Sequence, residues 1–246
     1  MCKIKRLCIF FVFIFSNLAV AENWSYVGHA GPEHWGQLDK RFAICNLGKE
    51  QSPIDISTKN IEKKKIDPIK TLYQASVGEL VNNGHTVQIN LTDAGYITLP
   101  SGEYRFMQFH LHTPSEEKID KKRFPLVFHL VHQNSAGHLA VIALLVRKGK
   151  ENPVLQEIFA HLPAKAGKVP LKSKFDLNTI LPSSLSAYSF EGSLTTPPCS
   201  EGVKWYVLKK PIELSKAEID AFRKIFKMNA RPIQSANGRK VFETRE

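Results

Sequence analysis

The sequence predicts a mostly β fold with a few short helices at its periphery. Several segments are rich in β-branched and aromatic residues, and turn-forming residues bound many of them. Only two segments show apolar residues at helical spacing. No internal repeat, low-complexity tract or Pro/Gly-rich linker divides residues 22–246, so we expect a single domain there.

Five segments are the clearest candidates for strands. They are TVQINL (86–91), EYRFMQFHLH (103–112), PLVFHLVH (125–132), HLAVIALLVRK (138–148) and VKWYVLKK (203–210). The run AVIALLV inside 138–148 contains no polar residue. An uninterrupted apolar run of this length indicates a central strand that is covered on both faces.

Two further segments are expected to form short helices. The first should open at Pro153, where Asn152 is placed to cap it. Its apolar stripe would consist of Leu155, Ile158, Phe159 and Leu162. The second should follow Ser215, because Ser215 and Glu218 have the spacing of a capping box. Its buried side would carry Ile219, Phe222 and Phe226.

Residues 1–21 have the composition of a secretory signal peptide. A basic start precedes an apolar run over 7–15, and small residues stand at Ala19 and Ala21. The run is too short to span a bilayer, and no later segment is longer, so no transmembrane segment is expected. We therefore expect cleavage after Ala21 and a periplasmic or secreted protein.

The charge balance is basic. The formal net charge of the whole chain is +11, and loss of the three basic residues in the signal segment leaves +8. The lysines are scattered, with denser patches at 62–70 and 120–123. This pattern favours a solvated surface over a nucleic-acid partner, which an exported protein seldom meets, and over a dedicated anionic surface.

The cysteines allow one disulfide bond. Cys2 and Cys8 would leave with the signal segment, so Cys45 and Cys199 remain. They would form either one intramolecular bridge or two buried free thiols. An oxidising compartment favours the bridge.

The histidines suggest a metal site. His110 and His112 are two residues apart, so they share one face of their expected strand. On the next strand, His129 and His132 point to opposite faces, and alternation alone does not decide which of them joins the pair. Three neutral imidazoles without a fourth protein ligand describe a catalytic zinc site with one open position. The alternative is that these are ordinary histidines of a sheet.

A set of motifs extends this interpretation. In chain order they are GPEHWG (31–36), QSPIDI (51–56), NNGHTV (82–87), QFHLHTPSE (108–116), HLVH (129–132), LTTPPCSEGVKW (194–205) and NARP (229–232). The set closely resembles the α-class carbonic anhydrases, in particular their exported bacterial members. The resemblance runs from about Trp24 to Val241, nearly the whole expected mature chain.

The resemblance implies a large, twisted, mainly antiparallel sheet with zinc at the bottom of a conical cleft. It implies that His110, His112 and His129 bind Zn²⁺, which leaves His132 as a structural residue on the other face. The implied activity is that of a carbonate dehydratase, in which zinc-bound hydroxide converts CO2 to bicarbonate and a proton. The resemblance also implies that Cys45 and Cys199 pair, since bacterial relatives form a disulfide at these positions.

Further roles follow from the same resemblance. Thr195 would accept the hydrogen bond of the hydroxide, donate its own to the buried carboxylate of Glu116 and hold a substrate oxygen with its N–H. Thr196 would line the polar side, and His85 would carry protons out of the cleft. The apolar substrate pocket would consist of Val131, Val141, Leu194, Val203 and Trp205.

The groups that orient the ligands depart from the family pattern. Gln108 matches the residue that orients the first ligand, and the Asn229 region supplies a backbone carbonyl for the second. In the family, the third ligand normally donates a hydrogen bond to a glutamate two residues before it, where this chain has Val127. We hypothesise that Glu117 replaces it and reaches His129. A Glu117 that points to solvent instead would lower the zinc affinity by roughly 10–100-fold.

The expected partners are small molecules. They are CO2, water and bicarbonate as substrates, with sulfonamides and anions as inhibitors, and a homodimer is one assembly open to the chain. The alternative function is a catalytically weak member of the same family that binds zinc or an anionic surface.

Overall fold

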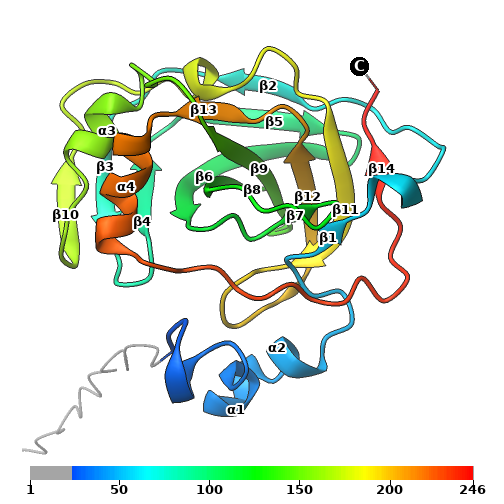
Figure 1. Cartoon of the computed structure of the whole chain (residues 1–246). Coiled ribbons are helices and arrows are strands. Elements are labelled where there is room, and N and C mark those ends of the chain that lie inside the picture. The colour runs from blue at the N-terminus through cyan, green and yellow to red at the C-terminus, as the bar shows by residue number, and fades with distance from the viewer. Residues whose placement is uncertain (1–23, 246) are drawn as a thin grey trace, which may run out of the picture.

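A large twisted β-sheet forms the centre of the computed structural model, which describes residues 24–245 (Figure 1). The predicted signal segment lies outside this range. Within it, the sheet has 12 strands, and its main path runs β10-β3-β4-β6-β8-β9-β12-β11-β14. The strands of this path are β10 (Gly167–Pro170), β3 (Gly78–Asn82), β4 (Val87–Leu91), β6 (Gly102–His112), β8 (Leu126–Gln133), β9 (Leu139–Lys148), β12 (Glu201–Leu208), β11 (Ala187–Ser193) and β14 (Phe242–Glu243).

Shorter strands extend this sheet at its sides. Strand β5 (Gly95–Leu99) pairs with β6 and with β2 (Lys70–Tyr73), while β13 (Ile212–Leu214) pairs with β9. A separate parallel pair consists of β1 (Asp55–Ile56) and β7 (Lys118–Ile119).

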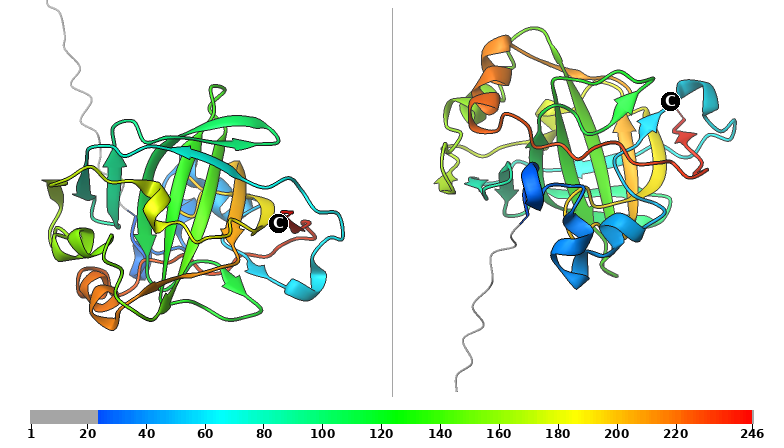
Figure 2. Two further views of the ribbon diagram at one scale, coloured as in Figure 1. Left: turned by 90° about the horizontal axis from the view of Figure 1, so that it is seen from above. Right: turned by 60° about the horizontal axis from the view of Figure 1, so that its bottom comes forward.

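The sheet is mainly antiparallel, as predicted. Strands β6, β8 and β9 form its centre in antiparallel register, and Figure 2 shows them crossing the molecule as long twisted ribbons. Residues 140–146 of β9 are buried without interruption, which confirms the prediction of a strand covered on both faces. Strand β9 also pairs in parallel with β12 and β13, a feature that the sequence did not predict.

Side chains alternate between two apolar layers, one on each face of the central strands. Phe128 and Leu130 of β8 belong to the larger layer, which also contains the buried side chains of α3 (Gln156–Ala160) and α4 (Lys216–Ile225). Val127 belongs to the smaller layer on the opposite face. His129 follows Val127 by two residues and therefore lies on the same face as the smaller layer.

The helices only partly match the expectation. Helix α4 begins after Ser215 with the predicted capping box, in which the Ser215 hydroxyl and the Glu218 carboxylate satisfy each other's backbone N–H. The prediction that the first helix opens at Pro153 was wrong, because residues 153–155 form a turn and α3 starts at Gln156. The side chain of Asn152 accepts hydrogen bonds from the backbone N–H groups of Val154 and Leu155, which stabilises that turn.

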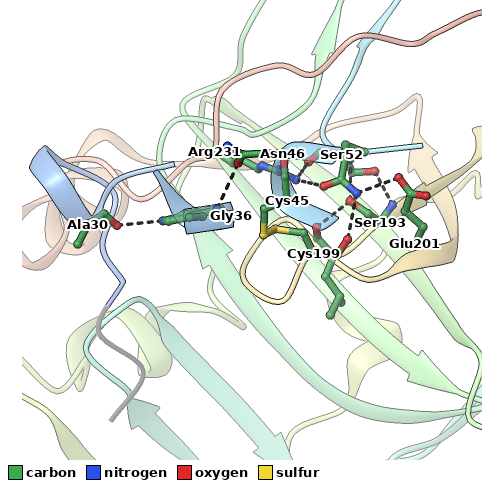
Figure 3. The surroundings of a disulfide bond; sticks show 12 residues. Ala30, Gly36, Cys45, Asn46, Ser52, Ser193, Cys199, Glu201 and Arg231 are labelled. Atoms are coloured by element: carbon green, nitrogen blue, oxygen red, sulfur yellow. Dashed lines mark hydrogen bonds between the residues drawn. A yellow bond between two sulfur atoms is a disulfide. The ribbon is translucent and has the colours of Figure 1, made fainter. Parts of the chain in front are cut away.

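Short helices near the start of the described chain lie together below the sheet in Figure 1. They are the 3-10 helices Gly28–Ala30 and Lys40–Phe42 and the α-helices α1 (Trp35–Leu38) and α2 (Ile44–Leu47). Cys45 of α2 is bonded to Cys199 with an S–S distance of 2.05 Å, so the predicted bridge is present (Figure 3). Trp24, Tyr26, Trp35 and Phe42 surround the bridge in a small apolar cluster.

Two more 3-10 helices, Thr58–Asn60 and Leu177–Ile180, lie between strands, and the second contributes Leu177 and Ile180 to the larger apolar layer. Across residues 24–245, no helix is both long enough and apolar enough to cross a membrane.

Candidate active site

Three histidines meet where β6 and β8 lie side by side. His110 stands directly opposite His129 in the antiparallel register, and His112 lies two residues further along β6 on the same face. One ring nitrogen from each residue lies within 4.8 Å of the other two, a spacing at which one metal ion can contact all three. His132 points to the opposite face, where its Nε2 is 2.7 Å from the Tyr73 hydroxyl.

Each of the three rings uses its other nitrogen in a hydrogen bond. His110 Nδ1 is 2.9 Å from Gln108 Oε1, and His112 Nδ1 is 2.6 Å from the backbone carbonyl of Asn229. His129 Nε2 is 3.0 Å from Glu117 Oε1. Because oxygen acceptors receive the proton of one nitrogen, the second nitrogen of each ring presents its lone pair to the other two histidines.

Burial keeps these imidazoles neutral. It lowers the pKa of His110 and of His129 well below 6.5, with the neighbouring histidines acting in the same direction. It lowers the pKa of His112 to about 4. Neutral imidazole is the form that binds a metal ion, so protons do not compete for these lone pairs near pH 7.

Two consecutive carboxylates lie beside the histidines. Glu116 and Glu117 are both fully buried, and Glu116 Oε2 is 3.5 Å from His112 Nε2 and 3.8 Å from His129 Nδ1. Burial, together with the charge of Glu117, raises the pKa of Glu116 to about 8, whereas the Thr195 hydroxyl acts in the opposite direction. A divalent cation between the histidines would favour the ionised form of both carboxylates.

The donor set fits such a cation. Within residues 24–245, His112 Nε2 and the Oε2 atoms of both glutamates are buried without a hydrogen-bond partner. Polar atoms of this kind are costly in a protein interior unless something compensates them. His112 Nε2 and Glu116 Oε2 lie beside the point at which the free histidine nitrogens converge, whereas Glu117 contacts the outer nitrogen of His129.

Glu116 is fixed by a residue that the sequence analysis did not single out. The backbone N–H of Arg231 donates to Glu116 Oε1 at 2.7 Å. The buried guanidinium of Arg231 donates in turn to the carbonyls of Ser52 and Cys45 and to the side chain of Gln51. Arg231 belongs to the NARP motif, and the signal that was overlooked is a charged residue beside Pro in a segment that returns to the site.

A small cavity of about 130 Å³ lies in front of the histidines. It is lined by His110, His112, Gln108, Gln88, Thr86, Asn83, His85, Thr196, Trp24 and Tyr26. The ring of His85 stacks on that of Trp24, with the ring centroids 3.7 Å apart and the planes 8° from parallel. Trp24 is the second residue near the site that sequence reasoning did not assign.

The five side chains predicted to form the apolar pocket lie together. Val131, Val141, Leu194, Val203 and Trp205 all belong to the smaller apolar layer, on the histidine side of the sheet. The Trp205 ring lies edge-on to the His129 ring at 4.9 Å. Thr195 follows Leu194 and is almost fully buried, whereas Thr196 reaches the cavity.

Comparison with known proteins decides the family. The family model described as eukaryotic-type carbonic anhydrase matches residues 30–245. The chain belongs to the α-class carbonic anhydrases. The carbonic anhydrase of Pectobacterium carotovorum is 40% identical over 219 residues, which cover 88% of this chain and 89% of that protein. That of Neisseria gonorrhoeae is 42% identical over 223 residues, covering 90% and 88%.

Solved structures of the family have the same fold. The α-carbonic anhydrase of Thermovibrio ammonificans, solved with the inhibitor sulfanilamide, superimposes with a TM-score of 0.88 at 39% identity. The match covers 90% of this chain and 99% of that chain. The family, the fold class and the enzyme class that the motifs predicted, that of a carbonic anhydrase lyase, are therefore confirmed.

Proposed function

We propose that this α-class carbonic anhydrase is a zinc-dependent enzyme that hydrates CO2 reversibly to bicarbonate and a proton. The observation that carries the proposal is the convergence of three neutral histidine nitrogens, each turned inward by a hydrogen bond on the opposite side of its ring. A set of three imidazoles with no fourth protein ligand is typical of catalytic zinc.

His110, His112 and His129 would hold the ion. When bound, zinc supplies a Lewis acid that makes water a strong nucleophile at neutral pH. The remaining tasks belong to the side chains of the protein, which must orient the nucleophile, seat the substrate and remove a proton.

Thr195 and Glu116 would orient the nucleophile. Glu116 is held at one oxygen by the Arg231 N–H, and as a carboxylate it only accepts hydrogen bonds. The Thr195 hydroxyl must therefore donate to Glu116 and accept from the nucleophile, which fixes the direction in which a lone pair points. The N–H of Thr195 would hold a substrate oxygen.

The apolar layer beside His129 would seat CO2. Val141 and Val203 are almost fully buried, and the Trp205 ring lies edge-on to that of His129. CO2 carries no charge and has no hydrogen to donate, so it is expected to bind against such a wall rather than to a charged group. Thr196 would mark the polar side of the cavity.

His85 would carry the proton away. It lines the same cavity as His110 and His112, and imidazole titrates close to neutral pH. Its stacked position on Trp24 places it at the wall that the N-terminal segment contributes.

We further propose that the enzyme works outside the cytoplasm, in the periplasm or as a secreted protein. The Cys45–Cys199 bond and the composition of residues 1–21 support this location. Since the related Thermovibrio enzyme was solved with sulfanilamide, we expect a sulfonamide to inhibit this one as well.

The test is stopped-flow CO2 hydration by the disulfide-intact protein, with bound zinc quantified in the same sample. Fast hydration that a sulfonamide abolishes is the expected result. Little activity with zinc fully bound would instead favour a zinc-binding protein with weak catalysis. Strong binding to anionic vesicles, lost at high salt, would favour a surface-binding role.

A further inference from the structure

The side chain of Glu117 is a buried carboxylate that is hydrogen-bonded to the ring of His129. Its side chain is inaccessible to solvent, and Oε1 lies 3.0 Å from His129 Nε2. Elsewhere in residues 24–245, no group donates a hydrogen bond to its Oε2. A carboxylate is expensive to bury, so a fold that keeps one here must compensate for it.

The backbone around Glu117 is fixed on both sides. The Ser115 hydroxyl donates to the Glu117 carbonyl at 2.8 Å and accepts from the Phe124 N–H at 3.0 Å. Immediately afterwards, Lys118 begins β7 and its N–H donates to the Ile54 carbonyl at 3.3 Å. The direction of the Glu117 side chain is therefore set by the fold.

Position 127 explains why this carboxylate is needed. Val127 stands two residues before His129 on β8, on the same face, and its apolar side chain is fully buried. It offers no acceptor to His129. His110 and His112 have Gln108 and Asn229 as acceptors, so without Glu117 the third ring would lack the oriented hydrogen bond that the other two make.

We propose that Glu117 is the positioning residue of the third metal ligand. By accepting the Nε2 proton of His129, it selects the tautomer whose Nδ1 lone pair faces His110 and His112, and it holds the ring at that angle. This inference rests on the proposed function, which it deepens by assigning the control of one ligand. A single Glu-Glu pair then flanks His129, with Glu116 Oε2 on its Nδ1 side and Glu117 Oε1 on its Nε2 side.

The experiment measures zinc affinity by competition with a chelator, using the disulfide-intact protein and the variants Glu117→Ala and Glu117→Gln. Loss of an orienting group of this kind lowers metal affinity roughly 10–100-fold, and we expect that range for Glu117→Ala. Glu117→Gln keeps the size and an amide oxygen, so its loss of affinity should be smaller. The visible spectrum of the Co²⁺-loaded protein should change in both variants, because it reports the geometry of the ligands.

The matched control is Glu218→Gln. Glu218 is also a buried glutamate, but it caps α4 and bonds to Ser215 and Asn152. This variant should lower the free energy of unfolding while zinc affinity and the Co²⁺ spectrum stay as in the parent.

Parental affinity and spectrum in Glu117→Gln and Glu117→Ala would overturn the proposal, as would an equal loss of affinity in Glu218→Gln. If Glu117→Ala does not fold, the near-isosteric Glu117→Gln decides alone. A parent protein that binds zinc tightly but does not hydrate CO2 would refute the proposed function and leave this comparison of affinities intact.

Discussion

In the proposed mechanism, the hydroxyl of Thr195 orients the nucleophile. Thr195→Val removes that hydroxyl and keeps the branched shape of the side chain. Loss of one oriented group at a reacting centre costs roughly 100-fold or more in turnover, so we expect kcat for CO2 hydration to fall by about that factor. Stopped-flow assays with zinc analysis test this, and the zinc content should not change. A variant that keeps most of its activity would remove Thr195 from the mechanism.

His132 should make the fold sensitive to acid. Burial lowers its pKa from 6.5 to about 3 in the folded protein. Between those values the unfolded chain binds a proton that the folded chain does not, so the free energy of unfolding falls as the pH is lowered through this window. The contribution is about 1.4 kcal/mol per pH unit.

The comparison that isolates this effect is parent against His132→Gln, both with a chelator present so that the other histidines contribute equally. Denaturant unfolding from pH 6.5 to pH 4 should show a shallower decline for the variant. If the free energy of unfolding of parent and variant changed equally with pH, His132 would not be a neutral ring in the folded protein.

Among single residues, the alternation of side chains along the strands predicted only part of the histidine site. It placed His110 and His112 together, but it left His129 and His132 equivalent, because strand parity does not tell which face of a neighbouring strand meets the pair. The register of β6 with β8 resolves this. Arg231 and Trp24 escaped prediction, since their roles depend on segments that meet only in the folded chain.

Among the helices, α4 offers a direct test of its capping box. Ser215→Ala removes the side chain that accepts from the Glu218 N–H, and we expect a loss of about 1 kcal/mol in the free energy of unfolding. Denaturant unfolding measures the loss. Zinc affinity should be unchanged, and an unchanged unfolding free energy would contradict the prediction.

Helices and strands could be predicted from the sequence where the segment itself contains all the residues that favour it. Ser215 and Glu218 carry both halves of a cap, and the five strands have long β-branched or aromatic runs. The segment after Asn152 has a cap residue and Pro153 as well, and Asn152 does accept hydrogen bonds from the N–H groups of Val154 and Leu155, but residues 153–155 form a turn and α3 begins only at Gln156. Short strands such as β1 and β13 lack a periodic pattern and depend on their partners.

For the whole molecule, the Cys45–Cys199 bond is the feature whose removal should change the free energy of unfolding most clearly. It closes a loop of 154 residues. On the chain-entropy model such a loop contributes roughly 5 kcal/mol, so the double variant Cys45→Ala, Cys199→Ala should unfold at a markedly lower denaturant concentration. Equilibrium unfolding of the variant and of the oxidised parent tests this. Coincident unfolding curves would show that the bond does not restrict the unfolded chain in the expected way.

The order of the strands is the part of the architecture that residues alone did not reveal. Parallel pairing of β9 with β12 joins segments separated by α3, β10 and β11, and no local pattern records which distant strand becomes a neighbour. The predicted twisted, mainly antiparallel sheet came from the resemblance of the motifs, whereas composition indicated only the β class.

Strand β14 has a consequence for how the protein reaches its native state. Residues 242–243 pair with β11 at one side of the sheet, and the Thr244 and Arg245 N–H groups donate to the carbonyls of Ala187 and Ile66. A sheet rich in pairings between distant segments folds slowly, and until residues 242–245 dock, β11 leaves part of its backbone open to another chain. Removing these residues should therefore reduce the yield of monomer on refolding, through aggregation, more than it reduces the activity of the molecules that fold.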